Sequence, residues 1–274
     1  MFLKHCSIFI VFLFAFGAFT AQAKPLQIPA IQVVPIKDSA TERQYELYIK
    51  LPKDYDADSA KTHPVIYIAD ALWHIEVISG SVDHLIKDAS LVGVSWEKGI
   101  PEQQSRMRDY MPNQYEGENY KHPTGMAHEH LAFWMNDVFK YVETEYKADP
   151  MDRSYYGYSV SGTFGSYILL TRPDAFKNYI LGSPVTLFDN HLVHEYEPIA
   201  KMIPKSLEAN VFVSVGSDES QDNINQAISL VQFLKARKAD NSQVDFRVIE
   251  SADHGTAFPI SAVQSLYWLA EVSD

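Results

Sequence analysis

The sequence of residues 154–170 is SYYGYSVSGTFGSYILL, in which two apolar runs flank a Gly-Tyr-Ser-Val-Ser-Gly turn. The spacing predicts a strand over 154–158 and a helix over 160–170. A serine between small residues at such a turn is typical of a nucleophile elbow, whose strained backbone projects Oγ from the sheet. The N-terminus of the following helix supplies N–H groups for an oxyanion. We therefore predict that Ser159 is a catalytic nucleophile.

One position departs from the G-x-S-x-G pattern of such elbows, because Ser161 occupies the place of the second glycine. Serine is small and Gly162 follows it directly, so we interpret the departure as a tolerated variant. The alternative is a chance Gly/Ser turn, which the strand and helix predicted on either side disfavour.

Strand-like and helix-like patterns alternate on both sides of this turn. Such alternation predicts a mostly parallel central sheet with helices on both faces. The strand run before the first helix suggests an antiparallel start, and we find no linker or repeat. We therefore predict a single domain with the α/β-hydrolase fold. The other predicted strands are 43–51, 64–69, 90–94, 179–181, 211–215 and 245–249, and the other predicted helices are 75–86, 127–146, 223–237 and 261–270.

The N-terminus has the pattern of a secretory signal peptide. A basic start precedes an apolar run over residues 7–19, and the Ala-Gln-Ala at 21–23 has the form of a signal-peptidase site. The alternative, a membrane anchor, is disfavoured because a spanning helix needs about 20 apolar residues. We predict cleavage after residue 23, a mature domain over 24–274, and a periplasmic or secreted protein. The one cysteine, Cys6, would leave with this leader, which excludes thiol catalysis and cysteine-based metal sites.

The chain of 274 residues carries 23 Lys and Arg against 35 Asp and Glu, a net charge of −12. Loss of the leader with Lys4 makes the charge −13. A charge of this sign repels phosphate backbones and argues against nucleic acid as a partner. After the leader no apolar run has the length of a membrane span, so we expect no membrane association after cleavage. The expected partner is a small-molecule ester substrate.

The candidate general base is His254, in Ser-Ala-Asp-His-Gly at 251–255, directly after the last predicted strand. In this fold the triad follows the chain order serine, acid, histidine. The alternative for His254 is a loop histidine that caps the last helix. His191 and His194 also follow the serine, but no predicted strand end directs them at it.

The triad acid is expected in Gly-Ser-Asp-Glu-Ser-Gln-Asp at 216–222, after the strand over 211–215. It must accept the Nδ1–H of the histidine and stabilise the imidazolium that forms. Three carboxylates compete for this role. We favour Glu219, followed by Asp218 and then Asp222, and we interpret the others as loop acids or helix N-terminal charges.

Residues 96–126 form a polar, Tyr-rich and Pro-punctuated segment that follows a predicted strand. Loops at the C-terminal ends of parallel strands build substrate pockets, so we predict that this segment forms the pocket. The alternative is a plain surface excursion. Arg106 and Arg108 are candidates for an anionic substrate group or, equally, for pairing with Asp109. The candidate substrate-binding residues are Trp73, Arg108, Tyr110 and Tyr158, and further aromatic residues of the segment are Trp96, Tyr115 and Tyr120.

Three further patches carry a resemblance to a known family. VIYIADA at 65–71 resembles the family's strand ending in Tyr-x-x-Asp-Gly, and RMRDYMP at 106–112 resembles its Arg-x-x-Asp-[Tyr/Leu/Phe]-x-Pro element. Residues 142–159 resemble its helix-strand-elbow unit. The chain therefore resembles the putative-esterase (esterase D-like) branch of the α/β-hydrolases, and most closely its bacterial siderophore (trilactone) esterases.

The resemblance implies a carboxylic ester hydrolase that forms an acyl-serine intermediate, without a cofactor, on a siderophore-type ester. It implies an oxyanion hole made by the backbone N–H groups of Leu72 and Val160. The family's count from Gly216 selects Glu219 as the acid. Ala71 stands where the family commonly has glycine, so a positive φ at this position would strain the alanine.

Other sites and functions are disfavoured. His128-Glu129-His130 lacks metal-site spacing, because residues two apart on a helix point to different faces, so we expect solvated side chains and no metal. No phosphate-binding glycine motif follows a first strand, so we expect no nucleotide cofactor. Two alternatives remain for the function. An acyltransferase would share the acyl-serine intermediate, and a non-catalytic binding protein on this scaffold would be expected to have lost triad residues.

Overall fold

The computed structural model describes residues 30–114, 121–184 and 206–273, and these are the described residues below. The predicted leader and its cleavage site lie outside them, as do Tyr115, Tyr120, His191 and His194. Among the described residues, no helix combines the length and apolar character that crossing a bilayer requires.

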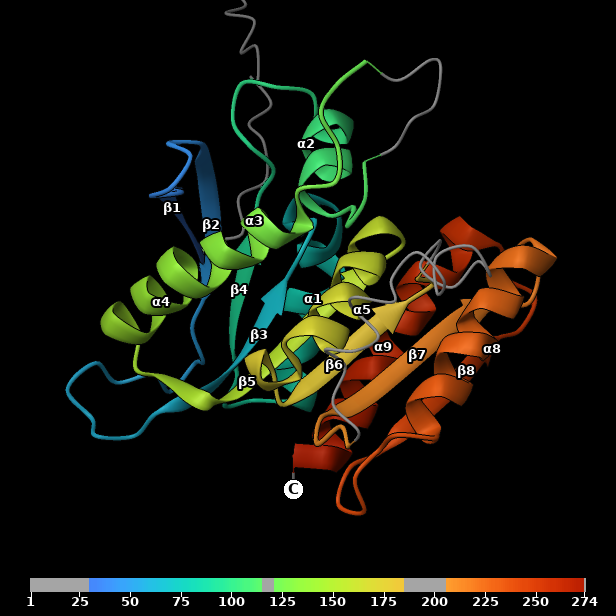
Figure 1. Ribbon diagram of the computed structural model, residues 1–274. Helices are drawn as coiled ribbons and strands as arrows, with labels where there is room; N and C mark the ends of the chain where they lie inside the picture. Colours follow the sequence, from blue (N-terminus) through green and yellow to red (C-terminus); the bar gives the residue numbers. More distant parts are fainter. Residues whose placement is uncertain (1–29, 115–120, 185–205, 274) are drawn as a thin grey trace, which may run out of the picture.

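The centre of the described chain is an eight-stranded sheet with the order β1-β2-β4-β3-β5-β6-β7-β8 (Figure 1). The pairs β1–β2 and β2–β4 are antiparallel, and the remaining pairs are parallel. This arrangement confirms the predicted, mostly parallel sheet with an antiparallel start. The strands are β1 (Ile31–Lys37), β2 (Gln44–Lys50), β3 (His63–Ile68), β4 (Ser90–Val94), β5 (Ala148–Tyr158), β6 (Asn178–Gly182), β7 (Asn210–Gly216) and β8 (Val244–Ile249).

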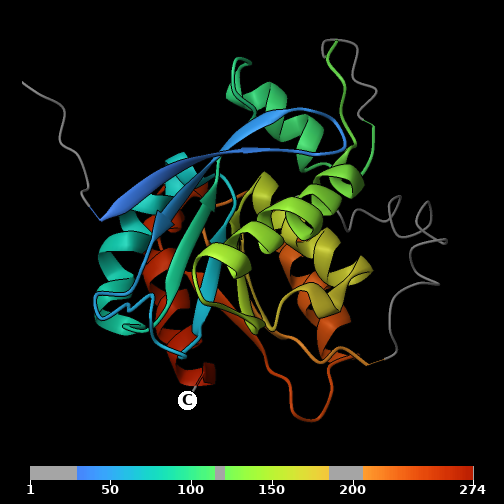
Figure 2. The same cartoon turned by 90° about the vertical axis from the view of Figure 1, so that its left-hand side faces the viewer.

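Helices cover both faces of the sheet, as Figure 2 shows with the sheet between two layers. On one face α1 (Ala71–Leu85) and α9 (His254–Ser273) pack on β3, β5, β6 and β7 through Ile78, Leu266 and Trp268. On the other face, α5 (Val160–Thr171) packs against the sheet through Phe164. The remaining elements of that face are α3 (Ala127–Phe133), the π-helical turn η1 (Trp134–Val138), α4 (Phe139–Glu145) and α8 (Gln221–Lys235), and η2 (Pro173–Ala175) is a 3₁₀ turn after α5.

Several elements differ from those predicted, and β1 was not predicted. The helix predicted from residue 75 begins at Ala71, and the one predicted from 261 begins at His254 and includes Pro259. The predicted helix over 127–146 is interrupted by the π-helical turn. The segment 96–126 contains a helix, α2 (Glu102–Asp109), that was not predicted because its residues are mostly polar. Tertiary packing overrides local propensity at such places.

The parallel strands β3, β5, β7 and β8 end at the same edge of the sheet. Their C-terminal ends are followed by Asp70, Ser159, Glu219 and His254, respectively. Residues that are far apart in the sequence therefore meet at one edge, which is where ligands bind in open parallel sheets.

Candidate active site

Ser159 lies between β5 and α5 with φ 60° and ψ −126°, a left-handed backbone that is strained for a residue with a side chain. Two glycines make this turn possible. A Cβ at Gly157 would collide with the carbonyl of Ser161, and one at Gly162 would lie 2.7 Å from the carbonyl oxygen of Gly182. The turn is therefore the predicted nucleophile elbow in its geometry.

Ser161, the departure from the glycine pattern, has a role in this turn. Its fully buried Oγ donates to the carbonyl of Tyr158 at 2.8 Å and accepts from the backbone N–H of Tyr158 at 3.0 Å. Because the hydroxyl satisfies both backbone groups of the residue before the nucleophile, it stabilises the elbow from inside. A glycine could not make these contacts.

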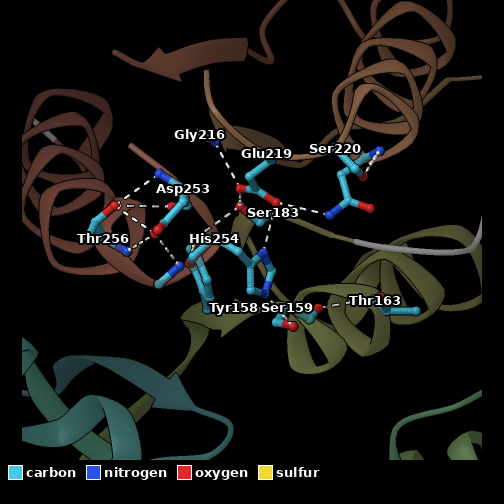
Figure 3. A network of polar contacts seen from close by, with 12 residues as sticks. Tyr158, Ser159, Thr163, Ser183, Gly216, Glu219, Ser220, Asp253, His254 and Thr256 are labelled. Carbon is cyan, nitrogen blue, oxygen red and sulfur yellow. Dashed lines mark hydrogen bonds and ion pairs between the residues drawn. The ribbon is translucent and has the colours of Figure 1, made fainter. Parts of the chain in front are cut away.

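His254, the first residue of α9, lies between Ser159 and Glu219 (Figure 3). Its Nε2 is 2.9 Å from Oγ of Ser159, and its Nδ1 is 2.8 Å from Oε2 of Glu219. Tyr158 donates its hydroxyl proton to the carbonyl of His254 at 2.7 Å, which holds the histidine backbone beside the elbow. The structure thus brings together the three residues that the sequence favoured for the triad.

The Glu219 carboxylate is enclosed by donors. Oε1 accepts from Oγ of Ser183 at 2.6 Å and from the N–H of Gly216 at 2.9 Å, while Oε2 also accepts from Asn223 at 3.1 Å. Burial acts to raise the pKa of Glu219, but the hydrogen bonds from His254 and these donors outweigh it and lower the pKa to about 2. The carboxylate is therefore ionised at neutral pH.

The competing carboxylates lie elsewhere. Asp218 is exposed and accepts from the hydroxyl of Ser217 at 2.9 Å, although its backbone N–H donates to the carbonyl of Ala252 and ties the acid loop to the histidine loop. Asp222 is exposed in the first turn of α8. Neither carboxylate makes a contact with His254, so their side chains are the loop acid and helix N-terminal charge that the sequence allowed.

Val160 and Leu72, the predicted oxyanion donors, are the first residue of α5 and the second of α1. Backbone N–H groups in a first helical turn have no acceptor within the helix and remain available. The positive φ before α1 falls on Asp70, at 55°, and Ala71 is helical. The condition for strain at Ala71, a positive φ at that position, is therefore not met.

Asp70 is fully buried and joins β3 to α1. Arg106 binds its two carboxylate oxygens at 2.8 and 2.9 Å, and the indole N–H of Trp96 donates to Oδ1 at 2.6 Å. The backbone N–H of Asp70 donates to the hydroxyl of Tyr110 at 3.2 Å. These contacts hold the turn that precedes Leu72. Tyr110 is 1% exposed and supports this turn from the core, which corrects its prediction as a substrate contact.

Arg108 is also buried away from the cleft. Its guanidinium binds Asp109 at 2.7 and 2.8 Å, Glu97 at 2.5 Å and the hydroxyl of Tyr45 at 3.2 Å. Arg108 therefore belongs to a buried polar network, which corrects its prediction as a substrate-binding residue. The neighbouring carboxylate of Asp109 was the sequence signal for this alternative.

A cleft of about 310 Å³ borders Ser159. Of the predicted substrate-binding residues, Trp73 and Tyr158 line it, and the guanidinium of Arg106 lies 4.3 Å from the ring centre of Trp73. The predicted pocket segment 96–126 thus contributes Arg106. His74 and Phe258 also line the cleft, and they were not predicted because α1 and α9 begin earlier than the sequence pattern indicates. The full lining is Trp73, His74, Arg106, Tyr158, Ser159, His254, Gly255 and Phe258.

The histidines of α3 do not form a site with the triad. His130 is buried rather than solvated as predicted, and its Nε2 accepts from the indole N–H of Trp134 at 3.0 Å. Burial lowers the pKa of His130 to about 4 despite the opposing charge of Asp109, so the ring is neutral. His128 is exposed. Within the described ranges, no group of His, Cys, Asp and Glu has an arrangement that could hold a metal ion.

The comparison with known families agrees with this geometry. A family model described as "Putative esterase" matches residues 39–271. The chain belongs to this family. It is a carboxylic ester hydrolase, and the family predicted from the sequence is confirmed.

The individual proteins that this esterase resembles share a quarter or less of its residues. The ferri-bacillibactin esterase BesA of Bacillus subtilis is 25% identical over 236 residues, covering 79% of this chain and 76% of the relative. The BES protein from Bacillus cereus superposes with a TM-score of 0.74 at 22% identity, covering 90% of this chain and 98% of the other. Siderophore hydrolase EstB from Aspergillus nidulans gives a TM-score of 0.69 at 17% identity, covering 90% and 97%. The two structures confirm the predicted α/β fold.

Proposed function

We propose that this esterase cleaves its substrate through an acyl-serine intermediate on Ser159. The observation that carries the proposal is the unbroken chain of hydrogen bonds from Ser159 through His254 to Glu219, at 2.9 and 2.8 Å. In such a chain the carboxylate orients the imidazole and stabilises its protonated form, while the imidazole activates the serine.

In the proposed reaction, Oγ of Ser159 attacks the ester carbonyl carbon while Nε2 of His254 takes the Oγ proton. The carbonyl oxygen becomes an oxyanion, which the N–H groups of Val160 and Leu72 stabilise. The C–O bond to the alcohol then breaks, and His254 returns the proton to the departing alkoxide. Water attacks the acyl-serine with His254 again as base, releasing the acid and restoring Ser159.

The substrate class that we propose is a siderophore-type ester, hydrolysed in the periplasm or outside the cell. The relative from Bacillus subtilis, named a ferri-bacillibactin esterase, supports the substrate class. The signal-peptide pattern of residues 1–23 supports export. Sequencing the N-terminus of the protein recovered from the periplasm or medium tests the second point, with Lys24 expected as the first residue.

Two measurements test the mechanism: covalent labelling by a fluorophosphonate probe, and turnover of p-nitrophenyl butyrate before and after labelling. Wild-type protein is expected to gain one adduct by intact mass and lose activity, whereas Ser159→Ala gains none. The substitution should lower kcat by a factor on the order of 10³ to 10⁶ and keep the melting temperature. Ser229→Ala, on the exposed face of α8, is the matched control and should label like wild type. Labelling of Ser159→Ala at the wild-type rate would overturn the nucleophile.

The p-nitrophenyl butyrate assay, repeated with an added alcohol, identifies whether water or the alcohol accepts the acyl group. A hydrolase yields mainly butyric acid at modest concentrations of glycerol or ethanol, because water deacylates the enzyme. An ester of the added alcohol as the main product would instead identify an acyltransferase, which shares the acyl-serine intermediate.

A further inference from the structure

His74, the fourth residue of α1, lines the same cleft as Ser159 and His254. Its ring centre lies 4.9 Å from that of Phe258 and 6.5 Å from that of Tyr158. Tyr158 immediately precedes the nucleophile, and Phe258 lies one helical turn after His254. The imidazole is therefore one side chain away from both the nucleophile and the base, although it contacts neither.

The proton position on His74 follows from its contacts. Its Nδ1 is 2.9 Å from the carbonyl oxygen of Ala69, the residue after β3. A carbonyl oxygen can only accept, so Nδ1 carries a hydrogen. Burial lowers the pKa of His74, with the charge of Asp70 opposing, so the ring is neutral at physiological pH. A neutral imidazole has one N–H, and Nε2 is therefore a hydrogen-bond acceptor.

This acceptor has no partner among the described residues. The ring that carries it is 4% exposed and lines the cleft, whereas the fully enclosed side-chain atoms without a partner in the described ranges lie on Tyr67, Ser90, Tyr156 and Trp268. His130 shows the contrast, since its Nε2 accepts from Trp134 in the core. An unpaired acceptor on a buried ring that lines a cleft is a feature that a donor on a ligand would satisfy.

The charges around the cleft favour a neutral donor as that ligand group. The Arg106 cation lines the same cleft, but both oxygens of Asp70 bind it, so the pair carries no net charge. An anionic group placed against the lone pair of His74 would be repelled. A hydroxyl or an amide N–H would instead complete the hydrogen bonding of the ring.

We propose that His74 is a specificity-determining residue whose Nε2 accepts a hydrogen bond from an O–H or N–H of the ester substrate, close to the scissile bond. The inference rests on the proposed function, because it assigns a subsite to the same cleft. It predicts a preference for esters that carry such a donor over esters of the same shape that lack it.

Two isosteric ester pairs test the preference. On the acyl side, p-nitrophenyl 3-hydroxybutyrate is compared with p-nitrophenyl 3-methylbutyrate; on the alcohol side, 2-hydroxyethyl butyrate is compared with propyl butyrate. In at least one pair the wild-type enzyme should show a kcat/KM about tenfold higher for the hydroxylated ester, the gain expected of one hydrogen bond in a desolvated site.

Two variants assign that preference to the ring. His74→Phe should lower kcat/KM for the preferred hydroxylated ester about tenfold and leave its apolar partner within about threefold, because phenylalanine keeps the packing but has no acceptor. His74→Gln should restore most of the preference, since its amide can donate to Ala69 and its oxygen can accept. Melting temperatures of both variants check that the fold is retained.

Three results would overturn the inference. The wild-type enzyme could show no preference in either pair, His74→Phe could keep the wild-type ratio, or both members of a pair could lose activity equally, as for a residue that only supports the fold. Each leaves the proposed esterase mechanism intact. A wild-type enzyme that is inert on all four esters would overturn the proposed function as well, which separates the two failures.

Discussion

The cleft is bordered by two strand-to-helix turns that each place one residue at positive φ, at ψ −126° for Ser159 and 42° for Asp70, and that are supported by different means. At Ser159, a parallel strand ends, one residue takes φ 60° and α5 begins; at Asp70, β3 ends, one residue takes φ 55° and α1 begins. The Ser159 turn is supported by Gly157 and Ser161, which lie two positions away in the sequence. The Asp70 turn is supported from residues 26, 36 and 40 positions away, which are Trp96, Arg106 and Tyr110.

The difference teaches that a turn with positive φ can be held by close packing of small residues or by the partners of a buried charge. The Ser159 turn exists because two glycines leave room for it. The Asp70 turn exists because a buried carboxylate is surrounded by donors, one of them a buried arginine. We call Ser159, its turn, His254 and Glu219 the triad side, and Asp70 with Trp96, Arg106 and Tyr110 the Asp70 side. We expect substitutions on the triad side to act mainly on catalysis and those on the Asp70 side to act mainly on stability.

The largest effect is expected from Glu219→Gln on the triad side. Loss of the charge that orients His254 should lower kcat on p-nitrophenyl butyrate about 10⁴-fold, as for other triads that lose their acid. Asp218→Asn is the matched control one residue away, and its exposed side chain should leave kcat within about twofold. A dominant loss at Asp218 or Asp222 instead would contradict the triad that the geometry supports.

Asp70→Asn should produce the largest loss of stability. Asparagine tolerates a positive φ, so the substitution removes the charge and keeps the turn, leaving the Arg106 cation buried and unpaired. Breaking such a pair costs about 3–5 kcal/mol in the free energy of unfolding, measured by urea denaturation. Asp88→Asn, in an exposed pair with Lys61, should cost less than about 1 kcal/mol. An equal loss in the free energy of unfolding for Asp70→Asn and Asp88→Asn would show that the buried charge does not support the Asp70 turn.

The stability of the triad side should also depend on pH through Glu219. Its pKa in the folded protein is about 2, below the ordinary value of 4.5. The stabilisation is therefore present above pH 4.5 and is lost as the pH falls toward 2. Urea denaturation of wild type and Glu219→Gln across this range should show a smaller decline for the variant. Parallel declines would mean that other carboxyl groups carry the dependence.

Gly157→Ala tests whether the Ser159 turn depends on the room that a glycine leaves, and we expect a smaller loss of activity than for Glu219→Gln. The added Cβ collides with the carbonyl of Ser161, so the elbow must shift, and misplacing a nucleophile by about 1 Å costs on the order of 10²-fold in kcat/KM. Gly80→Ala, exposed on α1 with no atom within 4 Å of its new Cβ, is the control. It should retain activity and stabilise the helix by up to about 1 kcal/mol. An active Gly157→Ala enzyme would show that the turn tolerates a side chain.

The residues that meet at Ser159 could be selected from the sequence because their features are local. The elbow lies within six consecutive residues, and His254 and Glu219 each follow directly after a strand that apolar runs reveal. The order of these segments along the chain then suffices, because the ends of parallel strands meet at one edge of the sheet.

The Asp70 side was predicted poorly because its polar residues are buried. Ser105, Arg106, Arg108 and Asp109 all lie on α2 with exposed fractions of 6% or less, whereas arginine and aspartate are rarely buried unless paired. Read alone, such a polar segment suggests solvent or substrate as the partner. The actual partners, Asp70 among them, lie far away in the sequence.

By itself, the sequence determined the fold, the family and the position of the strand-to-helix turn at Ser159, because strand and helix periodicity and a glycine-bounded turn are properties of neighbouring residues. Only the tertiary structure decided which polar side chains face the cleft. Arg106 and His74 line it, while Arg108 and Tyr110 do not. The physical reason is that a buried charge or hydrogen-bonding group must find its partner, and the packing of distant elements determines where that partner lies.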